Sequence, residues 1–136
     1  MLLIAVEVRA SAIHGLGVFA GEAVAKGQTV WQFDPGMDRK HPAEWLQRQP
    51  AHVRRFMALY GVLSLDRRHY YIAGDQTLYI NHSAAPNLVP RPEILVNDEE
   101  VVVAARDIAV GAELTIDYGT IDGADRDRLA QGGSLF

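Results

Sequence analysis

Short apolar runs separated by turn residues make up most of the chain. Many of these runs are rich in Val, Ile, Tyr and Phe, the residue types that favour strands. Glycines and the pair Asn97-Asp98 stand between the runs, at intervals typical of folds with many short strands. The pattern therefore predicts a mostly β protein. The predicted strands lie at residues 3–8, 17–20, 29–33, 70–73, 78–80, 94–96, 100–105 and 113–116.

One segment departs from this pattern. Apolar side chains within residues 42–64 recur at spacings of three and four, which is the period of one face of a helix. Pro42 and Pro50 fit the first turns of two short helices, because proline loses no helical hydrogen bond there. We therefore expect a helical insert at about residues 42–64. The apolar positions are Val53, Phe56, Met57, Tyr60 and Leu63.

The size of the chain predicts one domain. It has 136 residues and a mass of 15.0 kDa, and 49% of its residues are hydrophobic, enough for a single core. We expect this domain to span residues 1–136, with a polar, glycine-rich and loosely ordered tail at about 120–136. No apolar run is long enough to span a membrane, and residues 1–6 lack the features of a secretory signal. A cytoplasmic protein without a membrane partner is the resulting expectation.

Charge and residue content exclude several kinds of partner. The formal net charge of −4 argues against nucleic-acid binding, which needs clustered Lys and Arg to neutralise phosphates. An acidic surface favours a basic, lysine-bearing partner instead. The chain contains no cysteine, which excludes disulfides and cysteine-based zinc sites. The histidines show no metal-ligand spacing, so no metal site is predicted.

Three motifs carry the strongest functional signal. The segment Tyr-Ile-Asn-His-Ser-Ala-Ala-Pro-Asn occupies residues 79–87, and Glu-Leu-Thr-Ile-Asp-Tyr-Gly occupies residues 113–119. Nearer the N-terminus, His-Gly-Leu-Gly-Val-Phe-Ala occupies residues 14–20. In residue type, order and spacing, these segments resemble the SET domain, a family of lysine methyltransferases. The resemblance spans roughly residues 5–119.

The resemblance implies both a fold and an activity. The SET fold is mostly β and β-clip-like, with several small sheets, a short helical insert and a C-terminal pseudoknot. The implied activity is that of a protein-lysine N-methyltransferase, which transfers a methyl group from S-adenosylmethionine to a lysine side chain of a protein or peptide and releases S-adenosylhomocysteine. The alternative on the same fold is a non-catalytic module that binds a peptide or the cofactor without turnover.

The resemblance also assigns roles to residues. Tyr118 corresponds to the catalytic tyrosine, whose hydroxyl group would orient the amine for an in-line displacement that depends mainly on positioning. A core tyrosine at a strand end is the competing interpretation, which the paired motifs make less favourable. The Asn81 side chain is implied to reach the methionine end of the cofactor, and the His82 backbone its adenine. The implied cofactor-binding residues are Gly15, Leu16, Gly17, Asn81, His82 and Tyr118.

Aromatic residues elsewhere in the chain are candidates for lining the lysine channel. They are Tyr60, Tyr71 and Tyr79, and each is equally acceptable as a core residue. Helical spacing makes the core interpretation stronger for Tyr60. Two other chemistries receive little support. Glu113 and Asp117 are too far apart to form a coupled carboxylate pair, and Ser83 beside His82 lacks the Gly-x-Ser-x-Gly turn of a hydrolase.

The chain departs from the family pattern after the motifs. Many members carry a cysteine after Asn-His-Ser and a zinc-binding, cysteine-rich post-SET segment after the tyrosine. Here Ala84 takes the first position, and no cysteine is present. We therefore expect the donor pocket to be closed by the tail through Leu135 and Phe136, or by a partner such as a second copy in a homodimer.

Overall fold

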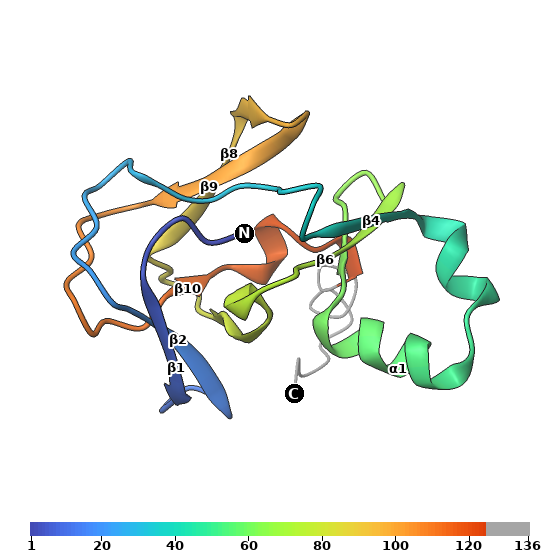
Figure 1. Cartoon of the computed structure of the whole chain (residues 1–136), viewed down its shortest axis with the longest axis horizontal. Helices are drawn as coiled ribbons and strands as arrows, with labels where there is room; N and C mark the ends of the chain where they lie inside the picture. The colour runs from blue at the N-terminus through green and yellow to red at the C-terminus, as the bar shows by residue number, and fades with distance from the viewer. Residues whose placement is uncertain (125–136) are drawn as a thin grey trace.

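Three small sheets organise residues 1–124, the part of the chain that the computed structural model describes (Figure 1). A hairpin, a five-stranded sheet of order β3-β9-β8-β10-β7 and a three-stranded sheet of order β4-β6-β5 confirm the mostly β prediction. The tail predicted at about 120–136 lies outside the described residues from position 125 onward. The strands are β1 (Val6–Ala10), β2 (Leu16–Ala20), β3 (Thr29–Trp31), β4 (Arg39–Pro42), β5 (Val62–Leu63), β6 (His69–Ile72), β7 (Asn81–His82), β8 (Leu88–Val96), β9 (Glu99–Ala104) and β10 (Thr115–Ile116).

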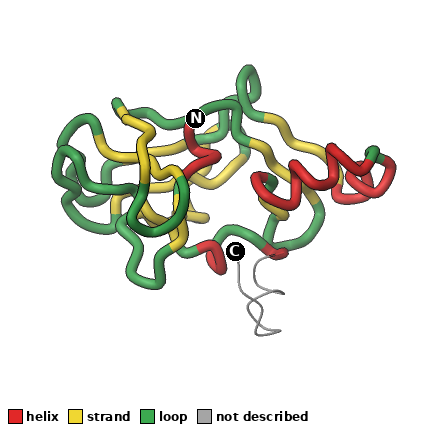
Figure 2. Tube along the Cα trace, turned by 90° about the horizontal axis from the view of Figure 1, so that it is seen from below, coloured by secondary structure: helices red, strands yellow, loops and turns green. Residues whose placement is uncertain are grey.

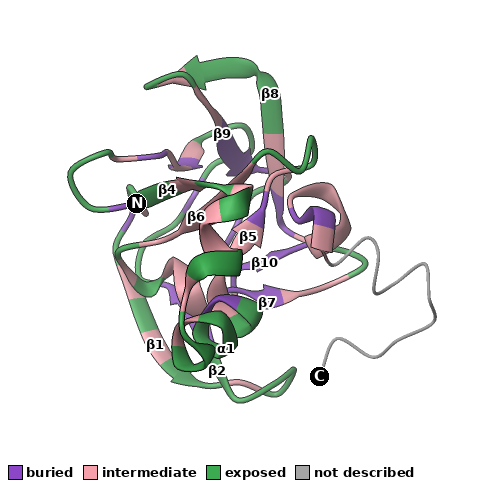
Figure 3. Ribbon diagram, turned by 90° about the vertical axis from the view of Figure 1, so that its right-hand side faces the viewer, coloured by how far each residue is buried: buried purple, intermediate pink, exposed green. Residues whose placement is uncertain are grey.

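The core lies between the hairpin and the five-stranded sheet. Leu114 is fully buried, and its backbone N–H donates to the carbonyl oxygen of Val18 in β2 at 2.7 Å. The segment before β10 therefore connects the hairpin to the sheet. All four residues at 101–104 of β9 are buried, because this strand has neighbours on both edges and packing on both faces (Figure 3).

Strand β10 lies between β7 and β8 and runs parallel to both. Residues 83–87 connect β7 to β8, so this connection has to cross β10, as expected of the pseudoknot. Asn87 fixes the crossing from a position that is only 6% exposed. Its Nδ2 donates to the carbonyl oxygen of Glu113 at 2.8 Å, and its Oδ1 accepts from the backbone N–H of Thr115 at 2.9 Å.

The insert predicted at about 42–64 contains two helices, a 3-10 helix η1 (Ala43–Arg48) and the α-helix α1 (Ala51–Tyr60). Pro42 and Pro50 directly precede them, in agreement with the prediction. The end of the segment differs, since β5 pairs with β6. The helices of the insert lie at one end of the molecule (Figure 2), away from the hairpin of β1 and β2 (Figure 1). Of the residues of α1, only Met57 is buried.

The strand predicted at residues 78–80 is wrong. The chain forms a 3-10 helix there, η2 (Gln76–Tyr79), because Oδ1 of Asp75 accepts from the backbone N–H of Thr77 at 3.0 Å and caps it. The predicted strands at 17–20, 29–33, 70–73 and 100–105 overlap β2, β3, β6 and β9. No helix within residues 1–124 is both long and apolar enough to cross a membrane.

Candidate functional site

Tyr118 lies where the two C-terminal motifs meet. It opens the short helix η3 (Tyr118–Thr120), one residue after β10. Parallel pairing places Ile116 beside His82, so Tyr118 comes to lie against β7. Its hydroxyl group donates to the carbonyl oxygen of Ile80 at 2.6 Å, and its backbone N–H donates to Nδ1 of His82 at 3.1 Å. Tyr118 is therefore held at both its backbone and its phenol.

The acceptor role of Nδ1 fixes the tautomer of His82. A ring nitrogen that accepts a hydrogen bond carries no proton, so the proton of the neutral ring is on Nε2. The rings of His82 and Tyr118 are tilted against each other with centroids 5.3 Å apart. Asp117 completes the turn, since its Oδ1 accepts from the backbone N–H of Gly119 at 2.9 Å. The side chain of His82 thus positions Tyr118.

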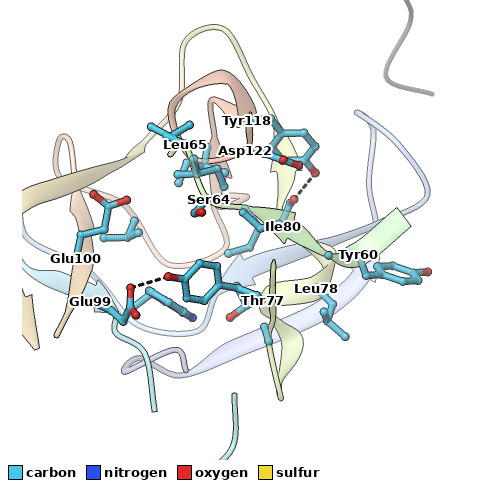
Figure 4. A pocket seen from close by; sticks show the side chains of 18 of the residues that line it. Tyr60, Ser64, Leu65, Thr77, Leu78, Ile80, Glu99, Glu100, Tyr118 and Asp122 are labelled. Carbon is cyan, nitrogen blue, oxygen red and sulfur yellow. Dashed lines mark hydrogen bonds between the residues drawn. The ribbon is translucent and has the colours of Figure 1, made fainter. Parts of the chain in front are cut away.

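Tyr118 also lines a cavity of about 530 Å³ (Figure 4). Its inner wall contains the buried side chains of Ile80, Leu88 and Ile116. Figure 4 shows Tyr118 on one side of this cavity and Glu99 and Glu100 on the other. The cavity is large enough to take an extended lysine side chain together with neighbouring residues.

The Asn81 side chain joins the first motif to Glu113, and among the predicted cofactor-binding residues it contacts Leu16. Its Nδ2 lies 3.1 Å from the carbonyl oxygen of His14, in the loop before β2, and 3.0 Å from that of Leu16, the first residue of β2. It also lies 2.9 Å from Oε1 of Glu113 and 3.2 Å from Oγ of Ser11. Carbonyl and carboxylate oxygens only accept, so the amide nitrogen has to face them. This orientation turns Oδ1 of Asn81 away from the loop as an acceptor.

The two glycines of the first motif are required for different structural reasons. Gly15 has a φ of +45°, and a Cβ built on it would meet nothing within 4 Å. Gly17 has no such backbone requirement, but a Cβ there would lie 2.3 Å from Oε1 of Glu113 and 3.0 Å from Cβ of Ser11. Gly17 therefore makes room for the Glu113 carboxylate, whereas Gly15 leaves open space beside the loop.

The three predicted channel tyrosines lie close together but have different surroundings. Tyr60 and Tyr71 line the cavity. Tyr79 instead packs against the core, and its ring meets that of Tyr60 edge-on with centroids 6.2 Å apart. The structure thus places Tyr60 and Tyr71 on the same cavity as Tyr118, with Tyr79 behind Tyr60.

Carboxylates on the far side of the cavity were not among the predicted site residues. Glu99 accepts from the Tyr71 hydroxyl group at 2.9 Å and forms an ion pair with Lys40. Burial and this hydrogen bond raise the pKa of Tyr71 to about 12, and the contact with Glu99 raises the pKa of Lys40. Burial, together with the charge of Glu99, raises the pKa of Glu100 above its ordinary value. No sequence motif marks these residues, because their shared cavity depends on tertiary packing.

Ser11 is the other residue that sequence reasoning missed. Its hydroxyl group joins the loop to Glu113 and caps the turn by accepting from the backbone N–H of Ile13 at 2.9 Å. A serine before a glycine-containing turn is a common capping signal, but it gives no distant partner. The structural role predicted for Glu113 agrees with its contacts to Ser11 and Asn81. Within residues 1–124, no group of three or more His, Cys, Asp or Glu residues has the arrangement of a metal site.

Comparison with known proteins supports this reading of the motifs. The SET domain family matches residues 15–119, and the chain belongs to this family. The H3 lysine-4 specific histone-lysine N-methyltransferase of Schizosaccharomyces pombe is 32% identical over 120 residues, which cover 85% of this chain and 13% of that protein. Histone-lysine N-methyltransferase 2D of Homo sapiens is 30% identical over 114 residues, which cover 79% of this chain and 2% of that protein.

Solved structures show the same fold. Polycomb Repressive Complex 2 of Chaetomium thermophilum bound to GSK126 aligns with a TM-score of 0.69 at 25% identity, over 94% of this chain and 17% of that one. The same complex in an autoinhibited conformation bound to S-adenosylmethionine gives a TM-score of 0.66 at 23% identity, over 95% of this chain and 17% of that one. This chain therefore corresponds to a small part of each of these much longer proteins.

Proposed function

We propose that this chain is an S-adenosylmethionine-dependent protein-lysine N-methyltransferase and that Tyr118 is its catalytic residue. One observation carries the proposal. Tyr118 lines the cavity on one side and contacts His82 on the other, so it stands between a space that fits a lysine and the motif loops predicted to hold the methyl donor. Membership of the SET family and the named activities of the relatives support the same reaction.

The residues around Asn81 fit the donor chemically. The methionine end of S-adenosylmethionine carries an ammonium group, which needs hydrogen-bond acceptors. Oδ1 of Asn81 is an acceptor turned away from the loop, and the backbone beside Gly15 is open. Asn81 and the backbone carbonyls of His14 and Leu16 would therefore bind the donor, with His82 beside them.

When bound, S-adenosylmethionine supplies a methyl group on a sulfonium: the lysine nitrogen forms a bond to this carbon as its bond to sulfur breaks, and S-adenosylhomocysteine leaves. The lysine has to be neutral at that moment, having lost its proton to water. Burial against Ile80, Leu88 and Ile116 lowers the pKa of an inserted ammonium and favours this state.

The orientation of the Tyr118 hydroxyl group suits the alignment of the amine. Its proton is directed at the carbonyl oxygen of Ile80, which leaves the phenol oxygen as an acceptor. That oxygen can accept from an amine N–H and make weak C–H···O contacts with a polarised methyl group. Tyr118 would thus position the nitrogen for in-line attack, which is where most of the rate enhancement of such a displacement originates.

The test compares Tyr118→Phe with Tyr70→Phe, a matched change on β6 away from the cavity. Calorimetry with S-adenosylhomocysteine measures donor binding, and radiolabel transfer from S-adenosylmethionine to a lysine peptide array measures turnover. We expect Tyr118→Phe to bind S-adenosylhomocysteine normally and to lose about 100-fold in rate, as when one oriented polar group is removed from an active site. Normal turnover in Tyr118→Phe would contradict the assigned role. Donor or peptide binding by the unaltered protein without any turnover would instead support the non-catalytic module.

A further inference from the structure

Several large apolar side chains at the rim of the cavity are exposed to solvent. Leu59 at the end of α1, Leu65 after β5 and Leu95 in β8 all line the cavity, and they are 76%, 41% and 63% exposed. They come from three separate elements and surround one hollow. Exposed apolar side chains gathered around a cavity are typical of surfaces that bind an apolar partner.

The charged side chains that line the same cavity are all acidic. None of the described lining residues is Lys, Arg or His. A low-dielectric hollow lined by one sign of charge concentrates its field and favours ligands of the opposite sign. The acidic lining residues are Asp66, Asp98, Glu99, Glu100 and Asp122.

Most of these carboxylates already have partners within the protein. Asp66 accepts from Ser64, Asp122 accepts from the backbone of Leu63, and Glu99 is paired with Lys40. The side chains of Asp98 and Glu100 have no hydrogen bond or ion pair among residues 1–124, and of these two Asp98 is exposed whereas Glu100 is half-buried beside the charge of Glu99. A half-buried carboxylate without a counter-charge is unfavourable in the free protein and is stabilised when a cation binds next to it.

We propose that this cavity selects a protein segment in which the target lysine has two kinds of neighbour: a second basic residue that binds Glu100, and a large apolar side chain that packs on Leu59, Leu65 and Leu95. The inference rests on the proposed function for the target lysine, and it assigns the choice of substrate to these four residues. Charge complementarity and the apolar rim point to the same occupant. A purely polar basic segment would leave the leucines exposed, and a purely apolar one would leave Glu100 uncompensated.

The test is a peptide array with a fixed central lysine and systematically varied neighbours, read in two ways. Tagged protein measures binding, and transfer of radiolabelled methyl groups measures turnover on the same peptides. We expect peptides with both an Arg or Lys and a Leu, Ile or Phe near the target to exceed those with neither by about tenfold, since each favourable contact contributes a few-fold. Glu100→Gln should abolish the preference for Arg or Lys and leave the preference for apolar neighbours intact. Leu59→Ser should have the opposite effect.

Matched controls and a charge reversal make the outcome specific. Glu93→Gln and Val110→Ser change exposed residues outside the cavity and should leave both preferences intact. Glu100→Lys should shift the preference toward peptides with Asp or Glu. Equal use of all lysine peptides, or selectivity that Glu100→Gln and Leu59→Ser do not change, would overturn the inference. A change in sedimentation of these two variants would also overturn it, because a second copy would then occupy the cavity. If no peptide is methylated but the binding preferences appear, the proposed activity fails and the inference stands.

Discussion

The hydroxyl oxygen of Ser11 lies 2.8 and 2.9 Å from the two carboxylate oxygens of Glu113. The same carboxylate accepts from Nδ2 of Asn81, which also reaches the carbonyl oxygens of His14 and Leu16. Three segments that are distant in sequence are thus tied together at the loop where the methyl donor is proposed to bind. Ser11 and Glu113 act on that site through Asn81 and the loop backbone.

This arrangement predicts that Ser11→Ala weakens donor binding more than it weakens the fold. The change removes the contact with Glu113 and the cap on the N–H of Ile13, so the loop carbonyls lose their fixed position. We expect the Kd for S-adenosylhomocysteine to rise about five- to tenfold and the free energy of unfolding to fall by about 1 kcal/mol, the usual net contribution of such hydrogen bonds. Calorimetry and urea unfolding measure the two effects.

Two variants test whether the hydroxyl group itself is responsible. Ser11→Thr keeps it and should restore most of the affinity, whereas Glu7→Gln on the exposed face of β1 should change neither quantity. An unchanged Kd in Ser11→Ala would show that the loop holds its shape without Glu113.

The glycines of the first motif predict unequal effects of the same substitution. In Gly17→Ala the new methyl group would lie 2.3 Å from Oε1 of Glu113, so the carboxylate has to move and the contacts with Ser11 and Asn81 are lost. We expect a loss of about 1–3 kcal/mol in the free energy of unfolding, as for other overpacked sites, together with weaker S-adenosylhomocysteine binding. Gly15→Ala meets no atom and loses only about 1 kcal/mol through its positive φ.

A double-mutant cycle separates the clash from other effects of the methyl group. Gly17→Ala should destabilise the Glu113→Ala protein less than the unaltered one, because the atom that it meets is gone. Equal losses of unfolding free energy in the two backgrounds would argue against a direct clash with Glu113.

We predict that Asn87 stabilises the crossing at β10. Asn87→Ala leaves the carbonyl oxygen of Glu113 and the N–H of Thr115 without their side-chain partner in a buried position. We expect the free energy of unfolding to fall by about 2–4 kcal/mol, since unpaired buried polar groups are expensive. Gln28→Ala removes a comparable amide contact, to the N–H of Ala25, at an exposed site and should lose less than about 1 kcal/mol. Similar losses in the two variants would contradict a special role for Asn87.

The parts of this site that lie in contiguous motifs could be predicted from the sequence. Asn81 and His82 lie in β7 and Tyr118 follows β10, so the parallel pairing of these two short strands brings the three residues together, and both strands lie within the motifs. The strand predicted at residues 78–80 was wrong because composition does not register the cap that Asp75 provides. The Ser11–Glu113 contact and the shared cavity of Leu59, Leu95 and Glu100 join distant segments, and no local periodicity encodes such contacts.

Glu100 predicts how the stability of the protein depends on pH. Burial, followed by the charge of Glu99, raises the pKa of Glu100 above 4.5, so the folded protein holds this proton more tightly than the unfolded chain. Ionisation of Glu100 therefore lowers the free energy of unfolding as the pH rises above about 4.5, until the carboxyl is charged in both states. Glu100→Gln removes this charge. The variant should match the unaltered protein below pH 4.5 and become more stable at neutral pH.

The gain should stay below about 1 kcal/mol, because water screens a half-exposed carboxylate. Urea unfolding at a series of pH values between 4 and 8 measures it, with Glu93→Gln as a control whose charge is well solvated. A pH-independent difference would contradict the raised pKa of Glu100. A less stable Glu100→Gln at neutral pH would mean that Glu100 already has a favourable partner in the free protein. The unfavourable charge of Glu100 links the stability of the protein to its choice of substrate. Glu100→Gln removes this charge from the free protein, whereas a cationic neighbour of the target lysine compensates it in the complex.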